Sequence, residues 1–486
     1  MRKFKGGFLL ITIFVFFVPL LLSAQDDFES WKQQQQEEFR AYKDANDKAF
    51  MKYLEDQWES FATFLGETRD ETPKPVDIPV SEAEEIELTD SSIVEIPEIP
   101  ELIIQEDSVI IKNSIEFLQP AEGKMVTVDY WGMQVELTEP ENFKLDLKYP
   151  IKSKSIAEFW YKVSNSDFEP LLDQLKQYKQ NMNLNDWGYC ILLHETGKIL
   201  TDNSKNLTRL FIWFILTKSG YETKVGYNKN GVYLLIPSEH PIYGQSYVKM
   251  GDKKFYIINF DDKEKLKLGI YTYKGAYPEV DDLTNLDVKE SPVIKSQLVE
   301  KDLKFRYAGR EYVINITLDK NTASFFKDYP QTNMKVYFSA PLSAQAENKL
   351  LSQLRPIIKG KSEGVAVNML LRFIQTAFPY KTDQNQFGHE KVFFSDEFLY
   401  YPYSDCEDRS IMFAYLVKKL VGLDVIGLDY PGHIATAVKF NSRIKGDTII
   451  YKKERYLICD PTYINANIGK GMPNFRKKAP KVINFL

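Results

Sequence analysis

Cysteine is scarce in this sequence: only three of the 486 residues are cysteines. They are Cys190, Cys406 and Cys459. An odd and low number excludes a disulfide scaffold and leaves room for a lone functional thiol. The metal-binding spacings CxxC and HExxH are also missing, so we predict no metal site and no cofactor.

Long apolar runs are missing after residue 22, so no later segment is expected to cross a membrane. The chain starts with basic residues, continues with an apolar run over residues 8–22 and reaches Ser23-Ala24-Gln25. This is the layout of a secretory signal peptide (residues 1–24) cleaved after Ala24, with an uncleaved N-terminal anchor as the alternative. We therefore predict an exported protein, either periplasmic or extracellular.

An excess of basic residues is missing as well. Cleavage after Ala24 removes Arg2, Lys3 and Lys5 and no acidic residue, which changes the net charge from −6 to −9. An acidic chain without a basic stretch is not expected to bind nucleic acid.

The apolar content of 44% is sufficient for two or three domains in a chain of this length. Residues 25–66 are predicted as one long helix, because Phe28, Phe39, Phe50 and Phe61 recur every eleven residues. Such a helix either lies on the protein's own surface or forms a self-associating or partner-binding arm. Residues 67–108 are acidic and rich in proline, and are predicted to form an extended, poorly ordered linker.

The rest of the chain contains two similar stretches, residues 109–290 and 291–486. Leu171-Leu172-Asp173-Gln174-Leu175 matches Leu350-Leu351-Ser352-Gln353-Leu354, and residues 204–209 align with residues 404–409. We interpret this as an internal duplication. The alignment places Asn206 at the position of Cys406 and Val232 at that of His433, so the first copy is predicted to be inactive.

The secondary structure predicted for the second copy segregates helices from strands, which indicates the α+β class. Strands near 304–307 and 312–316 precede the helices. Helices are expected at about 343–358, 362–378 and 405–420, and closing strands near 423–429, 433–440, 447–451 and 454–459.

Cys406 lies at the start of an expected helix, after a capping box formed by Ser404 and Glu407. His433 follows a Pro-Gly turn and opens a strand, and Asp460 ends a later strand. A thiol, a His and an Asp in these places are the parts of a nucleophile, its base and the group that orients the base. The helix dipole and a paired imidazolium would favour the thiolate of Cys406. Asp405, Glu407 and Asp408 oppose it by like charge, so His433 has to supply most of the effect.

Other interpretations of these residues stay open. Cys406 could pair with Cys459 in a disulfide, or bind zinc together with the His and the Asp. Strand alternation places Cys459 on the opposite face from Asp460, so we expect Cys459, like Cys190, to be a packed core thiol. Three further histidines are expected to be surface or packing residues: His194, His240 and His389.

These motifs resemble bacterial members of the transglutaminase-like superfamily over residues 345–465. The resemblance is carried by Asp405-Cys406-Glu407-Asp408, Gly432-His433, Asp460-Pro461-Thr462, Phe373-Ile374-Gln375, Pro379-Tyr380 and Asp396-Glu397-Phe398-Leu399. It implies a papain-type Cys-His-Asp site and acyl transfer through a thioester, either peptide hydrolysis or transamidation at glutamine. It also implies two tandem transglutaminase-like modules, if the duplication holds.

Two departures from the family pattern bear on the reaction. Ser404 replaces the glycine that usually precedes Asp-Cys, and Glu407 stands where the animal cross-linking enzymes carry tryptophan. The peptidase-like branch therefore fits better. The resemblance further implies that an upstream Gln or aromatic residue completes the oxyanion hole, with Gln375 and Tyr403 as candidates.

The sequence thus predicts an exported cysteine hydrolase that acts on a peptide or protein substrate. The alternative is a non-catalytic peptide-binding or assembly protein in which the triad is vestigial and the aromatic helix carries the function.

Overall fold

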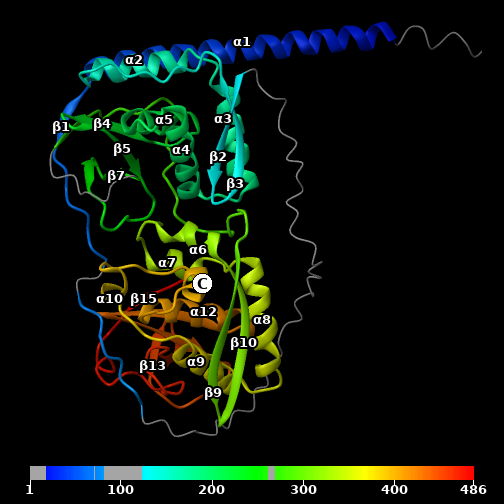
Figure 1. Ribbon diagram of the computed structural model, residues 1–486, viewed down its shortest axis with the longest axis vertical. Coiled ribbons are helices and arrows are strands. Elements are labelled where there is room, and N and C mark those ends of the chain that lie inside the picture. Colours follow the sequence, from blue (N-terminus) through cyan, green and yellow to red (C-terminus); the bar gives the residue numbers. More distant parts are fainter. Residues whose placement is uncertain (1–17, 70–71, 82–122, 261–268, 486) are drawn as a thin grey trace, which may run out of the picture.

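The computed structural model describes residues 18–69, 72–81, 123–260 and 269–485, and the side chains from residue 30 onward within these ranges. The predicted signal peptide lies mostly outside the described residues. Two units of mixed helix and sheet stack along the long axis of the molecule, with the first unit at the top of Figure 1. Within the described ranges, no helix combines the length and the apolar character that crossing a membrane requires.

The first unit consists of a hairpin, four helices and an antiparallel sheet. Its elements are β2 (Gly123–Tyr130), β3 (Met133–Pro140), α2 (Ser153–Ser164), α3 (Glu169–Asn181), α4 (Asp186–Leu200), α5 (Lys205–Lys218), β4 (Lys224–Asn228), β5 (Gly231–Pro237), β6 (Tyr247–Met250), β7 (Lys253–Ile258) and β8 (Ile270–Thr272). The sheet has the order β1-β8-β4-β5-β7-β6, and its edge strand β1 (Glu59–Phe61) comes from the N-terminal region.

The second unit repeats this plan. Its elements are β9 (Leu298–Tyr307), β10 (Arg310–Asp319), α6 (Lys320–Lys327), α7 (Met334–Ser339), α8 (Ala344–Ile358), α9 (Glu363–Ala377), α10 (Asp383–Phe387), α11 (Ser395–Tyr400), α12 (Cys406–Val421), β11 (Asp424–Tyr430), β12 (His433–Lys439), β13 (Thr448–Tyr451), β14 (Glu454–Cys459) and β15 (Lys481–Ile483). The sheet order is β13-β14-β12-β11-β15, and all its pairs are antiparallel.

The two sheets correspond strand by strand. The central hairpin β4–β5 matches β11–β12, the strands β7 and β6 match β14 and β13, and β8 matches β15. One long apolar helix packs on each central hairpin, α5 in the first unit and α12 in the second. The α+β class is confirmed. The predicted helices and closing strands of the second copy agree with α8, α9, α12 and β11–β14 to within one residue, but β9 begins six residues earlier than predicted, and α6, α7, α10, α11 and β15 were not predicted. A matching strand order is what an internal duplication would produce.

The N-terminal helix is shorter than predicted. Helix α1 (Val18–Asp56) ends ten residues before the expected end at residue 66, and Phe61 lies in the edge strand β1 instead. The C-terminal part of α1 packs on α2, where Phe50 is buried against the ring of Trp160 at a centroid distance of 4.7 Å. Phe39, in contrast, is 59% exposed. The aromatic repeat is therefore buried against the first unit at Phe50 and exposed to solvent at Phe39.

The predicted linker is in part an ordered segment. Residues 82–108 lie outside the described residues, but residues 72–81 run in extended form along the second unit. The Ser81 N–H donates to the carbonyl oxygen of Ile464 at 2.8 Å, and Val80 forms a parallel bridge with the same residue. In Figure 1 the chain leaves β1 and descends along the edge of the molecule to this place. The expectation of a poorly ordered segment is therefore wrong for residues 72–81.

Candidate active site

Helix α12 places Cys406 in its first turn, as the sequence predicts, but with a different cap. The N-cap residue is Asp405, and its backbone N–H donates to Asp408 Oδ2 at 3.2 Å. Ser404 was expected to cap the helix; its hydroxyl instead accepts a hydrogen bond from Arg409 Nε at 3.4 Å. The cap is shifted by one residue because Asp408, not Glu407, reaches back to the start of the helix.

The Cys406 thiol is fully buried. It donates to Glu407 Oε2 at 3.1 Å, and the backbone N–H of Ile434 lies within hydrogen-bonding reach of the sulfur. Burial and the charges of Glu407 and Asp405 raise the pKa of this thiol well above its ordinary value, against the opposing effect of Lys74. The expectation of a thiolate is therefore wrong for this form of the protein, since burial and the charges of Glu407 and Asp405 favour the neutral thiol.

His433 and Asp460 form the hydrogen-bonded pair that the sequence predicts, a histidine and the carboxylate that orients it. His433 Nε2 lies 2.9 Å from Asp460 Oδ2, and both side chains are buried. The other oxygen of Asp460 accepts from the backbone N–H groups of Thr462 and Tyr463 at 2.9 and 3.2 Å, which fixes its orientation. With Asp460 as acceptor, the hydrogen belongs on Nε2 and Nδ1 is left as a lone-pair acceptor. Nδ1 is buried and has no hydrogen-bond partner.

The structure brings together two of the three predicted catalytic residues and leaves the third beside them. No hydrogen bond joins Cys406 to His433, although both residues are described. Ile434 packs in the apolar cluster that contains Cys406, so strand alternation turns the His433 ring to the other face, where it stacks on Phe475 at 4.8 Å. The peptide group shared by His433 and Ile434 nevertheless lies next to the sulfur.

Of the two candidates for the oxyanion hole, Gln375 already uses its amide N–H groups elsewhere. Gln375 Nε2 donates to three backbone carbonyl oxygens, those of Asp460, Tyr463 and Ala466, at 3.2, 2.8 and 3.0 Å. Gln375 therefore positions the loop that carries Asp460. Tyr403 is 39% exposed, makes no hydrogen bond in the described structure and packs its ring under the Lys381 amine.

Tyr380 is a site residue that the sequence analysis did not single out. Its hydroxyl donates to the carbonyl oxygen of Pro75 at 2.8 Å. Burial and the nearby Cys406 raise the pKa of this phenol, so it stays a donor at neutral pH. The Pro379-Tyr380 pair within the motif match was the only signal in the sequence, since the hydroxyl finds its partner only in the fold.

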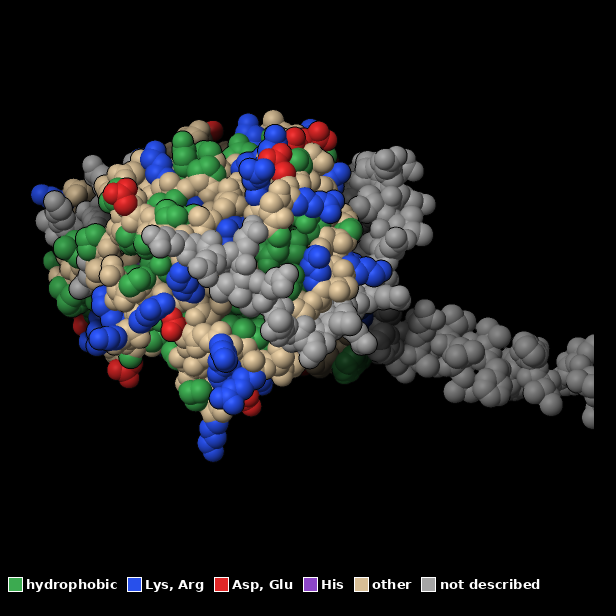
Figure 2. All heavy atoms as spheres, turned by 90° about the horizontal axis from the view of Figure 1, so that it is seen from below, with side chains coloured by type: hydrophobic (Ala, Val, Ile, Leu, Met, Phe, Trp, Pro, Cys, Tyr) green, Lys and Arg blue, Asp and Glu red, His purple; other side chains and the backbone are tan. Residues whose placement is uncertain are grey.

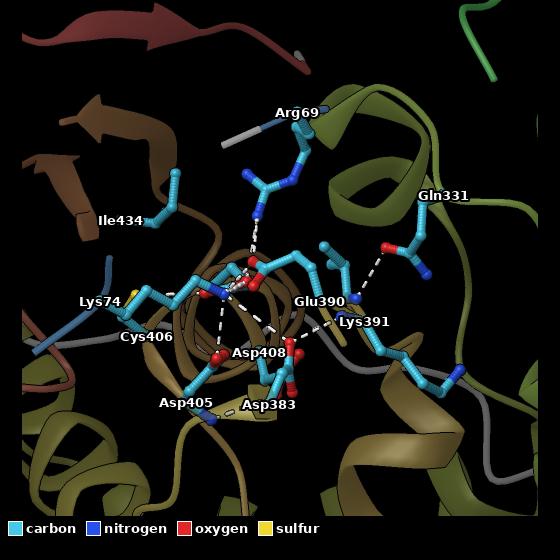
Figure 3. A network of polar contacts seen from close by, with 12 residues as sticks. Arg69, Lys74, Gln331, Asp383, Glu390, Lys391, Asp405, Cys406, Asp408 and Ile434 are labelled. Atoms are coloured by element: carbon cyan, nitrogen blue, oxygen red, sulfur yellow. Dashed lines mark hydrogen bonds and ion pairs between the residues drawn. The ribbon is translucent and has the colours of Figure 1, made fainter. Parts of the chain in front are cut away.

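An acidic pocket next to Cys406 is the second feature that the sequence did not reveal. We define it by four residues of the second unit, Asp383, Glu390, Asp405 and Glu407. Lys74 extends into it from the segment 72–81, and Figure 3 shows its amine among the carboxylate oxygens. The Lys74 Nζ atom lies 3.0 Å from Asp405 Oδ2 and 3.7 Å from Asp383 Oδ2, and it also contacts Glu390 and Glu407.

The carboxyl groups in and around the acidic pocket differ in their tendency to ionise. Burial opposes ionisation of Glu407, but the charges of Lys74 and Arg69 bring its pKa well below the ordinary value. Burial together with the charges of Asp408 and Glu407 raises the pKa of Asp383 to about 9, and burial with Glu407 raises that of Asp408 to about 7. Lys74 and Arg69 thus face one firmly ionised carboxylate and several carboxyl groups that hold their protons.

The surface offers a contrast to this interior concentration of charge. Seen from the end that carries the second unit, Lys and Arg side chains form several separate groups with hydrophobic side chains between them (Figure 2). Three of the four acidic residues of the pocket are buried, and Glu390 is partly exposed.

The first unit has no thiol, histidine or carboxylate at the positions that match Cys406, His433 and Asp460. Asn206 lies in the first turn of α5, where its Oδ1 accepts from the Val232 N–H at 2.9 Å, as the Cys406 sulfur faces the Ile434 N–H. In the hairpin register, Asn228 pairs with Gly231 as Tyr430 pairs with His433. The counterpart of His433 is therefore Gly231 and not Val232, a shift of one residue from the alignment. Asn259 follows β7 as Asp460 follows β14.

The remaining cysteines and histidines have structural surroundings. All three cysteines are free, and Cys190 and Cys459 are buried in the core, as expected. His194 is buried and packs against the Phe260 ring, as expected of a packing residue. His194 and His240 each also lie close to a carboxylate, 3.1 Å from Glu195 and 3.2 Å from Asp287.

The residue groups with metal-ligand geometry are not the predicted triad. Among the described residues they are Asp405 with Cys406 and Glu407, and two sets of carboxylates around Asp383. The Lys74 amine lies among these oxygens, so a cation of the chain itself already occupies this position.

Comparison with protein-family models, with curated proteins and with solved structures finds no match for this chain.

Proposed function

We propose that the protein is an exported cysteine hydrolase of the transglutaminase-like type, in which Cys406 attacks a peptide amide and His433 moves the proton. The observation that carries the proposal is the His433 side chain. Its Nε2 is held by Asp460 while its buried Nδ1 has no partner. A structural histidine usually satisfies both ring nitrogens, whereas a general base needs one of them free.

The reaction follows from these groups. His433 Nδ1 takes the thiol proton while the Cys406 sulfur bonds to the amide carbonyl carbon, and the tetrahedral intermediate expels the amine, which takes the proton from His433. Water then attacks the thioester, giving a proton to His433, and the C–S bond breaks to release a carboxylic acid and the thiol. The Tyr380 hydroxyl, which already binds a peptide carbonyl, is placed to donate to the oxyanion. If an amine replaces water, the same thioester leads to transamidation.

Two conditions must be met before this reaction starts. The segment 72–81 must leave, because it covers the site and the thiol is fully buried beneath it. The surroundings of Cys406 must also rearrange: the thiol must release Glu407, and the His433 ring, which now stacks on Phe475 on the other face of the strand, must turn to reach the thiol. The structure therefore corresponds to a resting form in this proposal.

Acylation by p-nitrophenyl acetate tests the proposal in the full chain carrying Lys74→Glu, which places a fifth carboxylate in the acidic pocket and should expel the segment. We expect an acetyl group on Cys406 and not on Cys190 or Cys459, as mapped by mass spectrometry. Adding His433→Ala should slow acylation at least about 100-fold, the usual contribution of a general base. Acylation of Cys406 at the same rate without His433, or no acylation of the folded protein, would refute the proposed function.

A non-catalytic peptide-binding protein is the second candidate. It is favoured by the raised pKa of the Cys406 thiol and by the extended peptide segment that already occupies the site. In that case the acylation experiment gives no modification of Cys406, while peptide binding persists.

A further inference from the structure

The segment 72–81 is held the way a bound peptide is held. Its main chain is recognised at both ends, by the Tyr380 hydroxyl at the Pro75 carbonyl and by Ile464 at the Ser81 N–H. Gly432 makes room for it, because a Cβ atom there would lie 2.8 Å from the Pro73 carbonyl oxygen. Extended backbone with main-chain contacts is the usual form of a peptide in a binding cleft.

In this segment two valine side chains are exposed and the charged lysine is buried, which is the opposite of the usual burial preference. Val76 and Val80 are 66% and 65% exposed, while the Lys74 side chain is only 4% exposed. Burying a lysine is costly unless its charge is paired, whereas burying valine is favourable. The second unit therefore selects the segment by its lysine and not by its apolar residues.

The pocket that receives this lysine is built entirely by the second unit. Its carboxylates come from α10, from the chain just after it and from the start of α12. Asp405 Oδ1 is also buried and has no hydrogen-bond partner. Without Lys74, Glu407 and Glu390 would both keep Arg69 as their cationic partner, whereas Asp405 and Asp383 would lose the cation with which they pair. A vacant pocket would thus attract another cationic side chain.

The pocket lies beside the reacting group. Asp405 and Glu407 flank Cys406 in the chain, and the thiol donates to Glu407 Oε2 at 3.1 Å. Proline precedes and follows Lys74 in the segment, so Pro75 offers no N–H and has a fixed backbone angle. A lysine in this pocket would therefore bring the neighbouring peptide group close to the sulfur and the Tyr380 hydroxyl.

We propose that the acidic pocket is a subsite for a lysine side chain of an extended peptide substrate, and that residues 72–81 occupy it as an intramolecular surrogate. This inference rests on the proposed function, which it extends with a substrate class and with a form of self-inhibition.

Peptide binding tests the inference without any chemistry. The probe is a fluorescein-labelled copy of residues 72–79, and the controls replace its lysine with norleucine or with glutamate. The protein is the full chain with Lys74→Glu to empty the pocket and Cys406→Ser to prevent turnover. We expect the lysine peptide to bind at least about tenfold more tightly than the norleucine peptide, the scale of one charge-assisted hydrogen-bond network. Glutamate should abolish binding.

Two matched proteins complete the experiment. The chain that keeps Lys74 should bind the probe at least about tenfold more weakly, because its tethered lysine competes at millimolar effective concentration. Adding Glu407→Gln to the emptied pocket should reduce the preference for lysine over norleucine. If Lys74→Glu does not fold, as judged by circular dichroism, Lys74→Gln takes its place.

The inference is overturned if the lysine and norleucine peptides bind equally, if neither binds, or if the chain that keeps Lys74 binds as tightly as the emptied one. Its failure is separate from that of the proposed function. Lysine-selective binding without acylation of Cys406 refutes only the hydrolase, and acylation without lysine selectivity refutes only the subsite.

Discussion

The first turn of α5 in the first unit and the first turn of α12 in the second occupy corresponding positions, each next to the central hairpin of its own sheet. In the first unit, Asn206 closes this position with a neutral hydrogen bond to a backbone N–H of the neighbouring strand. In the second unit, Cys406 faces the corresponding N–H, and buried polar atoms nearby have no partner, among them His433 Nδ1 and Asp405 Oδ1. Satisfied polar groups stabilise a fold, whereas unsatisfied ones are retained where chemistry or binding needs them.

The two units also differ in what covers them. Helix α1 buries Phe50 against the first unit, and the segment 72–81 buries Lys74 in the second. The first contact is built around aromatic packing, with one buried ion pair between Asp47 of α1 and Lys218 beside it, and it does not lie over a thiol. The second is a charge contact over a thiol, so one unit gains packing while the other is kept closed. The predictions below test this difference.

The largest effect is expected where α1 packs on the first unit. Phe50→Ala should lower the free energy of unfolding by about 3–5 kcal/mol, since the ring packs among buried aromatic side chains. Phe39→Ala, at an exposed position of the same helix, should change it by less than about 0.5 kcal/mol. Urea unfolding followed by tryptophan fluorescence measures both. If Phe39→Ala instead changes the mass of the protein in solution, the exposed half of α1 acts as a self-associating arm.

A smaller but specific effect is expected at Glu407. Glu407→Gln removes a negative charge that raises the pKa of the Cys406 thiol, so the thiol should become more acidic. It also removes an ion-pair partner of Lys74, so the segment that covers the thiol should be held less tightly. Alkylation of Cys406 by iodoacetamide at pH 7 should become at least about tenfold faster, which corresponds to one pKa unit. Glu195→Gln in the first unit serves as the control and should leave the rate unchanged. An unchanged rate in Glu407→Gln would argue against the role of this anion.

The first unit can be given a thiol to sharpen the comparison. Asn206→Cys places a half-buried thiol in the matching first turn, with Gly231 where the second unit has His433. We expect it to be alkylated faster than the covered Cys406 of the same chain, and at a rate that His433→Ala does not alter. The lost hydrogen bond to the Val232 N–H should cost about 1 kcal/mol of stability. Slower alkylation than at Cys406 would contradict the idea that the second unit is closed.

The smallest effect concerns Asp383. Its pKa is raised to about 9 in the folded protein, above the ordinary value of 3.8, so the folded state holds a proton that the unfolded state loses. The stability that this group contributes is present below pH 3.8 and is lost as the pH rises towards 9. Asp383→Asn should therefore change the melting temperature little at pH 4 and flatten its decline between pH 5 and 9. A decline as steep as in the wild type would show that Asp383 is ionised in the fold.

The sequence was a good guide to the elements of the second unit. Alternation and capping signals predicted the helix that starts at Cys406 and the strands that carry His433 and Asp460, because these are local properties. The cap itself was misplaced by one residue, because the Ser404 N–H donates to the Pro379 carbonyl oxygen while the Asp405 N–H donates to Asp408. The counterpart of His433 was misplaced by one residue as well, because only the hairpin register reveals that Gly231 matches it.

The acidic pocket could not have been predicted in this way. Lys74 lies more than 300 residues before Asp405 and Glu407 in the chain, within a stretch whose composition indicates disorder. Its burial depends on several carboxylates that come together only after folding. For the same reason Tyr380 gave little signal, since its partner is a carbonyl oxygen of that distant segment.

The pH dependence of Cys406 alkylation in the full chain with Lys74→Glu, with and without His433→Ala, tests the central claim most directly. If Cys406 is a nucleophile paired with His433 once the segment has left, the rate should already be high at pH 6 and should fall when His433 is removed. If both proteins instead show one identical rise above pH 8, Cys406 is an ordinary thiol and the catalytic account is wrong.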